Sequence, residues 1–520
     1  MTEGWWTDEG LGDLVAAGLR RLADEPFVVH SSTRPWRGTI GEVDRAARSF
    51  AATLQARGIG PGDIVVFQLP NWVEAAITFW GAAYAGVVVV PVVHFYGPKE
   101  LEYIIDVAQP ALVVTAARFG STDYLGSYAG LLSDREATWA VVGGSEGEAL
   151  PEGAVDFDAL LESTPVSAPV AVDPNAPAIV AFTSGTTRDP KGVIHSHRTI
   201  GFEARQLSGL YPPGPPPITG APVGHFIGML NAFLCTLICE TPIHVIDVWD
   251  PGEVLRLMIE EHLGVSGGST YFMTSLLDHP DFTAAHLEYM PVAGLGGSPV
   301  PVAVTERLAG LGIKVYRSYG STEQPSITGS YIDEPETKRL TTDGHALPGV
   351  ELRLDAEGQI ISRGPELFLG YTDAELTAGA FDDDGWYLTG DIGELDDDGY
   401  LTITDRISDV IIRGGENISA QEVEELLMEL DPVAEVAVVA VPDDRLGERA
   451  AAVLRLRAGE DTPTLDEVRV HLAERGLAKQ KWPEFIFPVI DLPRTPSGKV
   501  QKFRLRQQLR EGLLGKDAPT

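Results

Sequence analysis

Apolar and polar positions form two alternating patterns along the first 320 or so residues. Short apolar runs rich in β-branched residues, such as IVVFQL at 64–69 and GVVVVPV at 86–92, have the length of buried strands. Stretches at 39–57, 72–85 and 99–108 have helical spacing, and Thr39 with Glu42 predicts a capping box. The same order returns between 250 and 317. This alternation predicts an α/β fold with parallel sheets.

The pattern changes after about residue 341. GVELRLDAEGQIISRG and the segments that follow it have Gly and Asp turns, which predict short antiparallel strands. A candidate domain boundary lies near 405–415. Beyond it we expect a helix at 419–430, where Ser419 and Glu422 form a capping box, and a strand at 433–443. Two more helices are expected at 465–475 and 502–513.

Composition narrows the class of protein. The chain has 520 residues, too many for one hydrophobic core, and its net charge of −36 argues against nucleic acid or an anionic membrane as the main partner. The start MTEGWWTDEG lacks the features of a signal peptide, and no run of about 18 apolar residues predicts a membrane span. Cys235 and Cys239 lie in an apolar run, which favours buried free thiols over a metal site or a disulfide. Free thiols fit a cytoplasmic location, where cysteines stay reduced. Separately, the proline-rich stretch YPPGPPP at 211–217 predicts a rigid loop.

The stretch TSGTTRDPKG at 183–192 has the composition of an anion-binding loop. It is not a Walker loop, because Lys191 follows Pro190 and precedes Gly192. Hydroxyl and backbone N–H groups can nevertheless surround phosphate oxygens, and a lysine adds a point charge. A predicted strand precedes the loop, and a strand and helix follow it. From these residues alone, a phosphate site and an ordinary surface loop remain equal alternatives.

Four further motifs follow in order: YGSTE at 319–323, YLTGDIG at 387–393, DRISDVIIRGGEN at 405–417 and PRTPSGK at 493–499. With the loop at 183–192, they make the chain resemble the adenylate-forming enzymes, which include acyl-CoA synthetases, nonribosomal peptide adenylation domains and luciferases. The resemblance covers nearly the whole chain. It implies a large N-terminal domain at 1–404, made of two α/β subdomains and a small β-barrel-like part. A hinge at 405–409 and a small mobile α+β C-terminal domain at 410–520 would follow.

The resemblance implies that a carboxylate is joined to the α-phosphate of ATP, with Mg²⁺ on the phosphates. Glu323 would bind the Mg²⁺, since carboxylate oxygen is a ligand that this ion prefers. Lys499 would enter the site from the small domain and stabilise charge. Asp391 would accept hydrogen bonds from the ribose, and Arg406 would lie near the ribose and phosphates. Further nucleotide contacts, including the catalytic hydroxyls of Thr183 and Thr322, would come from Thr183, Ser184, Gly185, Thr186, Thr187, Lys191, Gly297, Ser298, Pro299, Tyr319, Gly320, Ser321 and Thr322.

Each of these roles has a simpler structural alternative. Tyr319 is assigned to the adenine but suits a packed aromatic position. Asp391 is equally typical of a turn. In the second reaction the acyl group passes to coenzyme A after the small domain rotates, and Gly414 and Gly415 would form the wall of the pantetheine channel. A glycine pair is also typical of the turn at a strand end.

Two positions depart from the family pattern. Ser408 stands at the hinge where the family more often has Asp or Lys, and Arg188 stands in the phosphate loop where Gly is frequent. A small serine can still absorb a change in backbone dihedral angles, so the resemblance implies that rotation is retained. How Arg188 affects the mobility of the phosphate loop is left open.

The acid would bind at the segment APVGHFIGMLNAF, residues 221–233. His225 would approach the carboxylate or act as an aromatic gate, although a structural role is equally consistent. Phe226, Ile227 and Met229 favour an apolar acid that is not an amino acid. The overall likeness is to bacterial ligases of the cyclohexanecarboxylate or medium-chain type, with aryl and sterol-side-chain acids also open. The substrate pocket would comprise His225, Phe226, Gly228, Met229, Gly296 and Gly320.

The leading hypothesis is an AMP-forming acyl-CoA ligase that acts on a small-molecule carboxylic acid, ATP and coenzyme A. One alternative is a stand-alone adenylating enzyme that loads a carrier protein. Another, of a different class, is a catalytically silent nucleotide- or acyl-binding protein. Retention of Lys499, Glu323 and Asp391 argues against the silent protein. No nucleic-acid partner and no integral membrane association are expected, and a homodimer is compatible with the resemblance.

Overall fold

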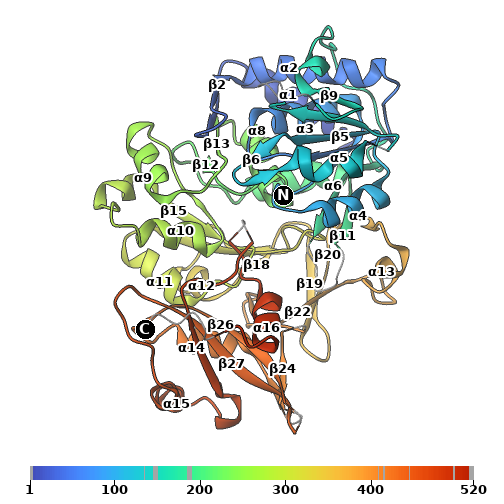
Figure 1. The fold of residues 1–520 in the computed structure, drawn as a ribbon. Coiled ribbons are helices and arrows are strands. Elements are labelled where there is room, and N and C mark those ends of the chain that lie inside the picture. The colour runs from blue at the N-terminus through green and yellow to red at the C-terminus, as the bar shows by residue number, and fades with distance from the viewer. Residues whose placement is uncertain are drawn as a thin grey trace.

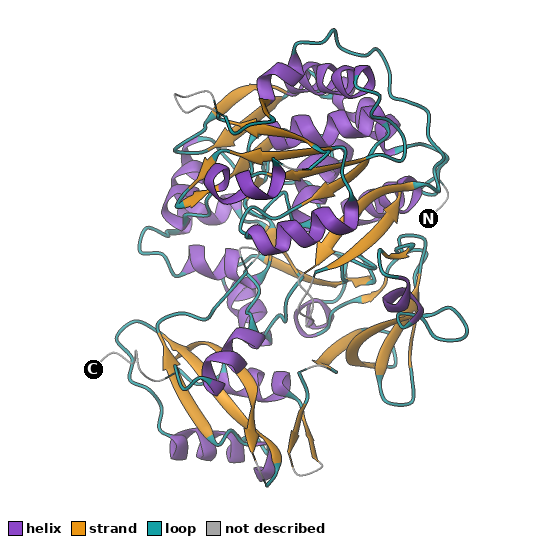
Figure 2. Ribbon diagram, turned by 45° about the vertical axis from the view of Figure 1, so that its right-hand side comes forward, coloured by secondary structure: helices purple, strands orange, loops and turns teal. Residues whose placement is uncertain are grey.

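The computed structural model describes residues 4–133, 135–144, 150–183, 190–407, 409–413, 416–443, 445–495 and 498–514. Helix-covered sheets make up the larger N-terminal part, and the C-terminal strands and helices lie beside it (Figure 1). In the turned view of Figure 2, these C-terminal strands are separate from the sheets of the larger part. The α/β class predicted from the patterning is confirmed.

An eight-stranded sheet forms the first unit. Its central strands are parallel, and β11 and β21 extend it in antiparallel directions. The predicted helix at 39–57 is α2, and its capping box joins Thr39 to Glu42 as expected. In order across the sheet, the strands are β21 (Gly370–Tyr371), β11 (Lys191–Ser196), β10 (Pro177–Thr183), β4 (Val88–Pro91), β3 (Ile64–Gln68), β5 (Leu112–Ala116), β8 (Thr138–Val142) and β9 (Ala154–Asp156).

Seven α-helices accompany this sheet in the described part of the first 230 residues. They are α1 (Leu11–Arg21), α2 (Ile40–Ala56), α3 (Val73–Ala85), α4 (Pro98–Ala108), α5 (Tyr124–Leu132), α6 (His197–Ser208) and α7 (Phe226–Leu230). The run that begins with α7 continues through a π-helical turn, η2 (Asn231–Cys235), into the short helix α8 (Thr236–Ile238). Short elements β6 (Arg118–Phe119), β7 (Thr122–Asp123) and the 3-10 turn η1 (Phe157–Leu161) complete this unit.

Two further sheets form the second unit. One has the order β12 (Ile218–Thr219), β13 (Ile243–Ile246), β1 (Pro26–His30) and β2 (Trp36–Thr39). The other has the order β14 (Gly267–Gly268), β15 (Val292–Leu295), β16 (Lys314–Tyr319), β17 (Thr328–Gly329) and β18 (His345–Ala346). Its helices are α9 (Pro251–Glu260), α10 (Thr270–Leu277), η3 (Ala284–Tyr289), α11 (Val302–Gly310) and α12 (Glu336–Thr341), as the returning α/β pattern predicted.

The β-rich segment is a four-stranded antiparallel sheet, which confirms the strands predicted after residue 341. Its order is β19 (Glu351–Leu354), β20 (Gln359–Arg363), β22 (Tyr387–Leu395) and β23 (Leu401–Arg406), with α13 (Ala374–Ala378) beside it. Strands β22 and β23 carry Asp391 opposite Arg406. This register places two of the motif residues side by side.

The C-terminal part has its own sheet and its own buried clusters. Ser419 caps α14, but Glu422 does not return the bond as predicted, because its carboxylate pairs instead with Lys481 Nζ at 2.6 Å. Its elements are β24 (Ile411–Arg413), β25 (Glu416–Ile418), α14 (Ala420–Leu427), β26 (Val433–Asp443), β27 (Gly447–Leu456), α15 (Leu465–Glu474), η4 (Lys479–Lys481), β28 (Phe485–Val489) and α16 (Lys502–Arg510).

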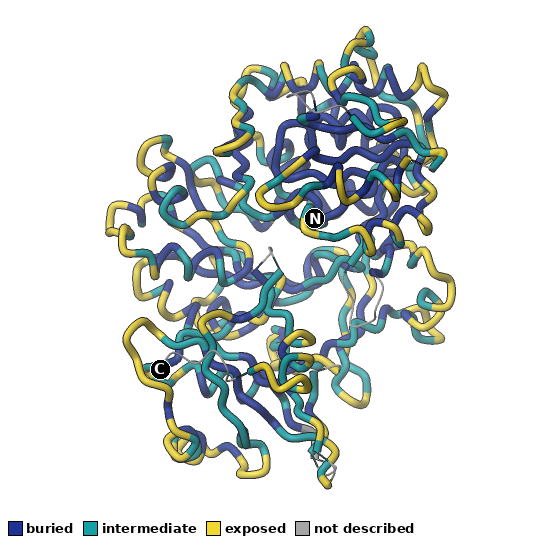
Figure 3. The backbone as a smooth tube through the Cα atoms, in the orientation of Figure 1, coloured by how far each residue is buried: buried dark blue, intermediate teal, exposed yellow. Residues whose placement is uncertain are grey.

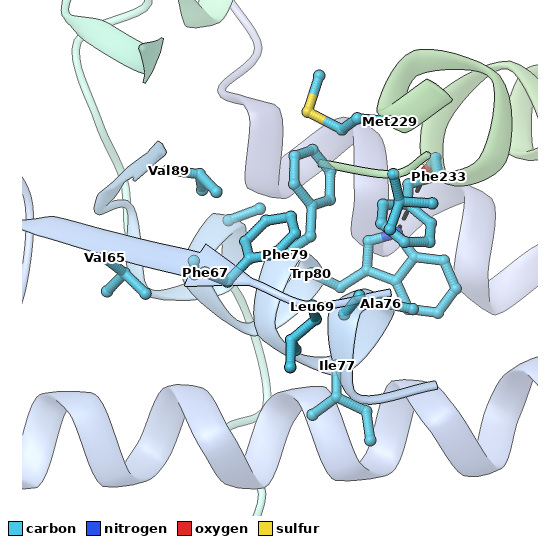
Figure 4. Close-up of a cluster of buried hydrophobic side chains, with 14 of the residues drawn as sticks. Val65, Phe67, Leu69, Ala76, Ile77, Phe79, Trp80, Val89, Met229 and Phe233 are labelled. Carbon is cyan, nitrogen blue, oxygen red and sulfur yellow. Dashed lines mark hydrogen bonds between the residues drawn. The ribbon is translucent and has the colours of Figure 1, made fainter. Parts of the chain in front are cut away.

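The main core lies in the first unit. Buried backbone is concentrated in its strands, as the dark tube in Figure 3 shows. Helix α3 is apolar on all sides and fully buried, so Phe79 and Trp80 pack between the sheet and the helical run that contains Met229 and Phe233 (Figure 4). None of the helices in the described residues is long and apolar enough to cross a bilayer. Cys235 is buried and Cys239 half-buried, and both are free thiols.

Candidate active site

A single large cavity of about 1890 Å³ collects most of the motif residues. Its lining comes from the ends of β10 and β16, from the hairpin of β22 and β23, and from the C-terminal part. The motif residues within the lining are Thr183, Lys191, Gly296, Gly297, Ser298, Pro299, Tyr319, Gly320, Ser321, Thr322, Glu323, Asp391, Arg406 and Lys499. Segments more than 300 residues apart in the sequence therefore meet in one space.

Asp391 is the centre of a hydrogen-bonded group at one wall of the cavity. Its carboxylate accepts from the Tyr319 hydroxyl at 2.7 Å and from Arg406 Nε at 2.6 Å. Asp391 is only 3% exposed, whereas the Arg406 side chain is 44% exposed and borders the cavity. The turn alternative for Asp391 is excluded, because it lies within β22. Tyr319 is both a packed aromatic and a partner of Asp391, so its ring is fixed.

The YGSTE loop brings Thr322 and Glu323 to the cavity. Glu323 Oε1 accepts a hydrogen bond from the Tyr371 hydroxyl at 2.7 Å. The Thr322 carbonyl accepts from His195 Nε2 at 2.7 Å, which fixes the neutral histidine in one tautomer. Burial lowers the pKa of His195 to about 4. Gly320 is required here, since a Cβ would overlap the Pro325 carbonyl.

Two buried carboxyl groups behind this loop were not found from the sequence. Gln324 donates to Glu366 Oε1 at 2.7 Å, and the Ser326 hydroxyl donates to Glu203 Oε1 at 2.8 Å. Burial, followed by the charge of Glu366, raises the pKa of Glu203 to about 8. Burial also raises the pKa of Glu366 to about 7. Glu203 lies in the helix α6 and Glu366 in a turn after β20, and a glutamate in either place is ordinarily exposed, so the sequence carried no signal that these two are buried.

The predicted phosphate loop is described only at its two ends. Thr183 and Lys191 are paired across β10 and β11 and both border the cavity. Lys191 Nζ lies 5.4 Å from the centre of the Tyr371 ring, the same ring whose hydroxyl reaches Glu323. The predicted contacts at Ser184, Gly185, Thr186 and Thr187, the variant residue Arg188, Ser408 at the hinge, and Gly414 and Gly415 lie outside the described residues.

The loop at 296–299 lies in the lining, with the predicted nucleotide contacts Gly297, Ser298 and Pro299 and the predicted pocket residue Gly296. A Cβ at Gly296 would come within 2.6 Å of the Ser318 carbonyl oxygen, so only glycine lets this backbone lie flat against β16. Gly297 has φ of +74° and open space around it. The loop therefore offers bare backbone to a flat ligand, with Ser298 and Pro299 at its edge.

Lys499 reaches the same cavity from the C-terminal part. Its backbone is held by a tight turn in which the Thr495 N–H donates to the Lys499 carbonyl at 2.8 Å. Arg494 supports the turn, lying 5.4 Å over the Tyr271 ring of α10. The Arg406 guanidinium, and then burial, lower the pKa of Lys499 to about 8, while Asp391, Asp409 and Glu323 oppose this shift. Lys499 is therefore close to the groups predicted to hold the nucleotide.

The predicted acid pocket is partly corrected by the structure. His225 and Phe226 border the cavity, and Phe226 stacks on His195 with ring centres 5.0 Å apart. Gly228 and Met229 do not border it. Met229 packs into the main core beside Phe233 (Figure 4), because the helix that contains both turns this face inward. Gly228 is needed for close packing, since a Cβ would overlap the Pro222 carbonyl.

His225 is poised as a neutral donor or acceptor at the cavity. Burial, followed by the charge of Lys499, lowers the pKa of His225 to about 4. Its Nδ1 is buried with no partner among the described residues. An unpartnered buried ring nitrogen favours a ligand contact over a purely structural role. Sequence reasoning did not single out other wall residues, among them Tyr211, Asn231 and Tyr316, although Asn231 lies within the segment 221–233 that was predicted to bind the acid.

Comparison with known proteins shows to which family a chain with this arrangement belongs. The family model described as AMP-binding enzyme matches residues 16–372, and the model described as AMP-binding enzyme C-terminal domain matches residues 422–499. The chain belongs to the AMP-binding enzyme family. The predicted membership of the adenylate-forming superfamily, and with it the assignment as an enzyme, are confirmed.

Two relatives of this AMP-binding enzyme span nearly its full length. A medium-chain fatty-acid–CoA ligase of Escherichia coli K12 is 32% identical, over 98% of this chain and 92% of its own. A 3-[(3aS,4S,7aS)-7a-methyl-1,5-dioxo-octahydro-1H-inden-4-yl]propanoyl:CoA ligase of Rhodococcus jostii RHA1 is 37% identical, over 91% of this chain and 94% of its own.

A solved structure bears on the arrangement of the two parts. ATP-bound MatB from Rhodopseudomonas palustris is 29% identical, covers 97% of this chain and 100% of its own, and superposes with a TM-score of 0.84. The apo form of the same protein gives only 0.73 at the same identity and coverage. As a whole, this AMP-binding enzyme therefore superposes better on the ATP-bound form of that relative than on its apo form.

Proposed function

We propose that this enzyme is an AMP-forming acyl-CoA ligase, which converts a carboxylic acid, ATP and coenzyme A to an acyl-CoA, AMP and pyrophosphate. The observation that carries the proposal is the meeting of Lys499 with Asp391, Arg406 and Glu323 in one cavity. A site that joins two anions needs cations and donors at fixed positions. The activities after which the two full-length relatives are named support the same class of enzyme.

In the first reaction, a carboxylate oxygen of the acid attacks the α-phosphorus of ATP. The new oxygen–phosphorus bond forms as the bond to the pyrophosphate oxygen breaks, and pyrophosphate leaves with the electron pair. Lys499 and Arg406 stabilise the negative charge that builds up. Asp391, held by Tyr319, accepts hydrogen bonds from the ribose. His225 lies beside Lys499 and binds the acid carboxylate through its neutral ring.

A magnesium ion fits the chemistry of the donor set beside these groups. One oxygen of Glu323 accepts from Tyr371, and the other accepts no hydrogen bond from the described residues, so it is free to bind a hard cation. When bound, Mg²⁺ would screen the phosphate charges. Glu323 is the protein ligand we propose for it.

In the second reaction, the sulfur of coenzyme A attacks the acyl carbonyl carbon and the bond to the AMP oxygen breaks. The thiol proton goes to solvent and AMP leaves. We propose that residues 410–520 rotate about a hinge at 405–409 between the two reactions, withdrawing Lys499. Gly414 and Gly415 would then approach the pantetheine arm, where the absence of a Cβ permits a narrow channel.

The acid is proposed to be apolar, such as a medium-chain, alicyclic, aryl or sterol-side-chain acid. The lining beside His225 is largely uncharged, with Phe226, Ile227 and Leu237 among its residues. The relatives named above act on a medium-chain fatty acid and on a bicyclic propanoate. A cytoplasmic location and a homodimer remain predictions.

The test is product analysis with Mg²⁺, ATP and a panel of acids, with and without coenzyme A. The panel runs from acetate through octanoate, cyclohexanecarboxylate and benzoate to a bile acid, and AMP and acyl products are read by mass spectrometry. An acyl-CoA with stoichiometric AMP is expected for at least one apolar acid. Accumulation of acyl-AMP that coenzyme A leaves unchanged would instead favour an enzyme that loads a carrier protein. ATP binding without AMP formation from any acid would favour a silent binding protein.

A further inference from the structure

The acid end of the cavity contains a group of uncharged polar side chains that the reaction does not use. The Tyr211 hydroxyl donates to Asn231 Oδ1 at 2.6 Å, and both residues are half-buried in the lining. The two amide hydrogens of Asn231 are donated to no acceptor among the described residues. They are therefore available to a ligand in the cavity.

Asn231 occupies a special place in its helix. It begins the π-helical turn η2, which interrupts the run from α7 to α8. Side chains hold this turn open: Trp80 Nε1 donates to the Phe233 carbonyl at 3.2 Å, and the Thr236 hydroxyl donates to the Ala232 carbonyl at 2.8 Å. Single π-helical turns occur frequently at functional sites. Here Asn231 and Cys235 border the cavity while the two residues after Asn231 pack in the core.

A second hydrogen-bond donor, the Tyr316 hydroxyl, belongs to a residue that borders the same cavity from β16. Tyr316 of β16 is paired with Gly294 of β15, and a Cβ on Gly294 would lie 2.5 Å from the Tyr316 hydroxyl. The glycine therefore makes room for the ring. The Tyr316 hydroxyl forms no hydrogen bond within the described residues, yet the residue is only 3% exposed. Burial, then Cys235 and then Tyr316, raise the pKa of Tyr211, which places these groups near one another.

The charge around these donors limits what they can bind. Six arginines of the described residues border the cavity. Among them, Arg21 pairs with Glu240 at 2.9 Å, Arg205 with Glu9 at 2.6 Å, and Arg317, which follows Tyr316 in the chain, with Asp343 at 2.7 Å. No unpaired cation of the described lining accompanies Asn231 and Tyr316. A second carboxylate would thus lack a counter-charge, whereas a neutral oxygen would find donors.

Helix geometry gives the separation of this group from the reacting carboxylate. Asn231 follows His225 by six residues, and six residues of α-helix rise about 9 Å. A three-carbon acid that ends in a saturated ring spans a similar length. An acceptor on the far side of such a ring would reach Asn231 while its carboxylate lies at His225.

We propose that Asn231 and Tyr316 bind an uncharged acceptor oxygen, a ketone carbonyl, at the end of the acyl group remote from its carboxylate. The preferred substrate is then a ring-bearing apolar acid with a keto group. This inference rests on the proposed function and specifies its substrate class.

The experiment compares 3-(4-oxocyclohexyl)propanoate with 3-cyclohexylpropanoate as substrates, with octanoate as a reference acid. AMP release gives kcat/KM for each acid with the full-length wild-type enzyme and with the N231L, Y316F and I227V variants. Ile227 borders the same cavity without a polar group, so I227V is the matched control for a change in pocket shape. The readout is the ratio of kcat/KM for the keto acid to that for the ring without oxygen.

We expect the ratio to fall about tenfold in N231L and several-fold in Y316F, and to remain at the wild-type value in I227V. An unchanged ratio in both N231L and Y316F would overturn the inference. If N231L does not fold, Y316F decides, because it retains the ring and removes only the hydroxyl. If octanoate is activated but neither ring acid is, the inference fails while the ligase function stands. If no acid yields AMP, the proposed function itself fails.

Discussion

The two ends of the cavity are built from different chemistry. At the end that we propose binds the nucleotide, Asp391, Arg406, Glu323 and Lys499 are charged and lie close to one another. At the acid end, the polar groups are neutral, and the pair of Tyr211 with Asn231 is typical. Charged groups must occupy fixed positions to act on phosphates, so they recur as sequence motifs. Neutral wall residues fit one particular acid, and no general motif marks them.

The largest difference between the two ends should appear when Lys499, the cation that the C-terminal part brings into the cavity, is removed. Lys499→Ala should lower the rate of acyl-adenylate formation about 10²–10³-fold, because one fixed charge at a reacting phosphate is lost. The measurement is pyrophosphate release in single turnover with an acid that the panel identifies. Lys479→Ala, at an exposed lysine of the same part, should leave the rate unchanged. A K499A enzyme with the wild-type rate would remove Lys499 from the mechanism.

Loss of the ribose acceptor should have the next largest effect. Asp391→Asn removes the charge that pairs with Arg406 and accepts from Tyr319, so we expect kcat/KM for ATP to fall about 10–100-fold. Steady-state kinetics against ATP at saturating acid would measure this. Asp397→Asn, in the exposed turn after β22, is the matched control and should behave as wild type. Equal values for both variants would contradict a binding role for Asp391.

The lowered pKa of Lys499 predicts how the nucleotide end responds to pH. The charged form is needed, and a pKa of about 8 means that the free enzyme loses this charge as pH rises through 8. We expect kcat/KM for ATP to decline by up to tenfold per unit above about pH 8. In Lys499→Arg the decline should move to higher pH, since arginine stays protonated. A K499R profile that falls at the same pH would assign the titration to another group.

The buried carboxyl groups behind the YGSTE loop should make the stability of the folded enzyme depend on pH. The folded pKa of Glu203 is about 8, well above the 4.5 of an unfolded glutamate. The stability from its neutral form is therefore complete below about pH 4.5 and is lost as pH rises towards 8. Glutamine cannot ionise, so Glu203→Gln should remove this loss of stability at high pH. We expect the variant to melt at the wild-type temperature at pH 5 and a few degrees above wild type at pH 8.

Calorimetric or fluorescence melting between pH 5 and pH 8 would measure this difference. Glu357→Gln, in an exposed turn, should follow the wild-type curve throughout. Parallel curves for E203Q and wild type would mean that Glu203 is ionised in the folded enzyme at neutral pH.

The sequence predicted the nucleotide end far better than the acid end. The order of the motifs identified the family, and the spacing of Thr39 and Glu42 located a helix cap that the structure confirms. The capping box at Ser419 was half wrong, because Lys481, 59 residues away along the chain, takes the Glu422 carboxylate. Such a competitor becomes visible only when distant elements pack together.

The residues that border the acid pocket could not be predicted from the sequence, because they too depend on contacts between distant elements. Met229 was predicted to border it, and Asn231 was not considered. Which face of this helix meets the cavity depends on the π-helical turn, which in turn depends on a hydrogen bond from Trp80, some 150 residues earlier. Glu203 and Glu366 were missed because a buried carboxyl group has the same sequence signature as an exposed one.

The glycine floor of the cavity determines where this enzyme can acquire new substrates. At Gly294 and Gly296 even a methyl group would press on β16, at Tyr316 and at the Ser318 backbone, so a saturation library there should yield mostly inactive proteins. Ile227 and Asn231 border the cavity from the helical wall, outside any strand, so changes there should alter the shape of the pocket without moving the sheet. Natural divergence and laboratory selection should therefore both work on the wall and leave the floor unchanged.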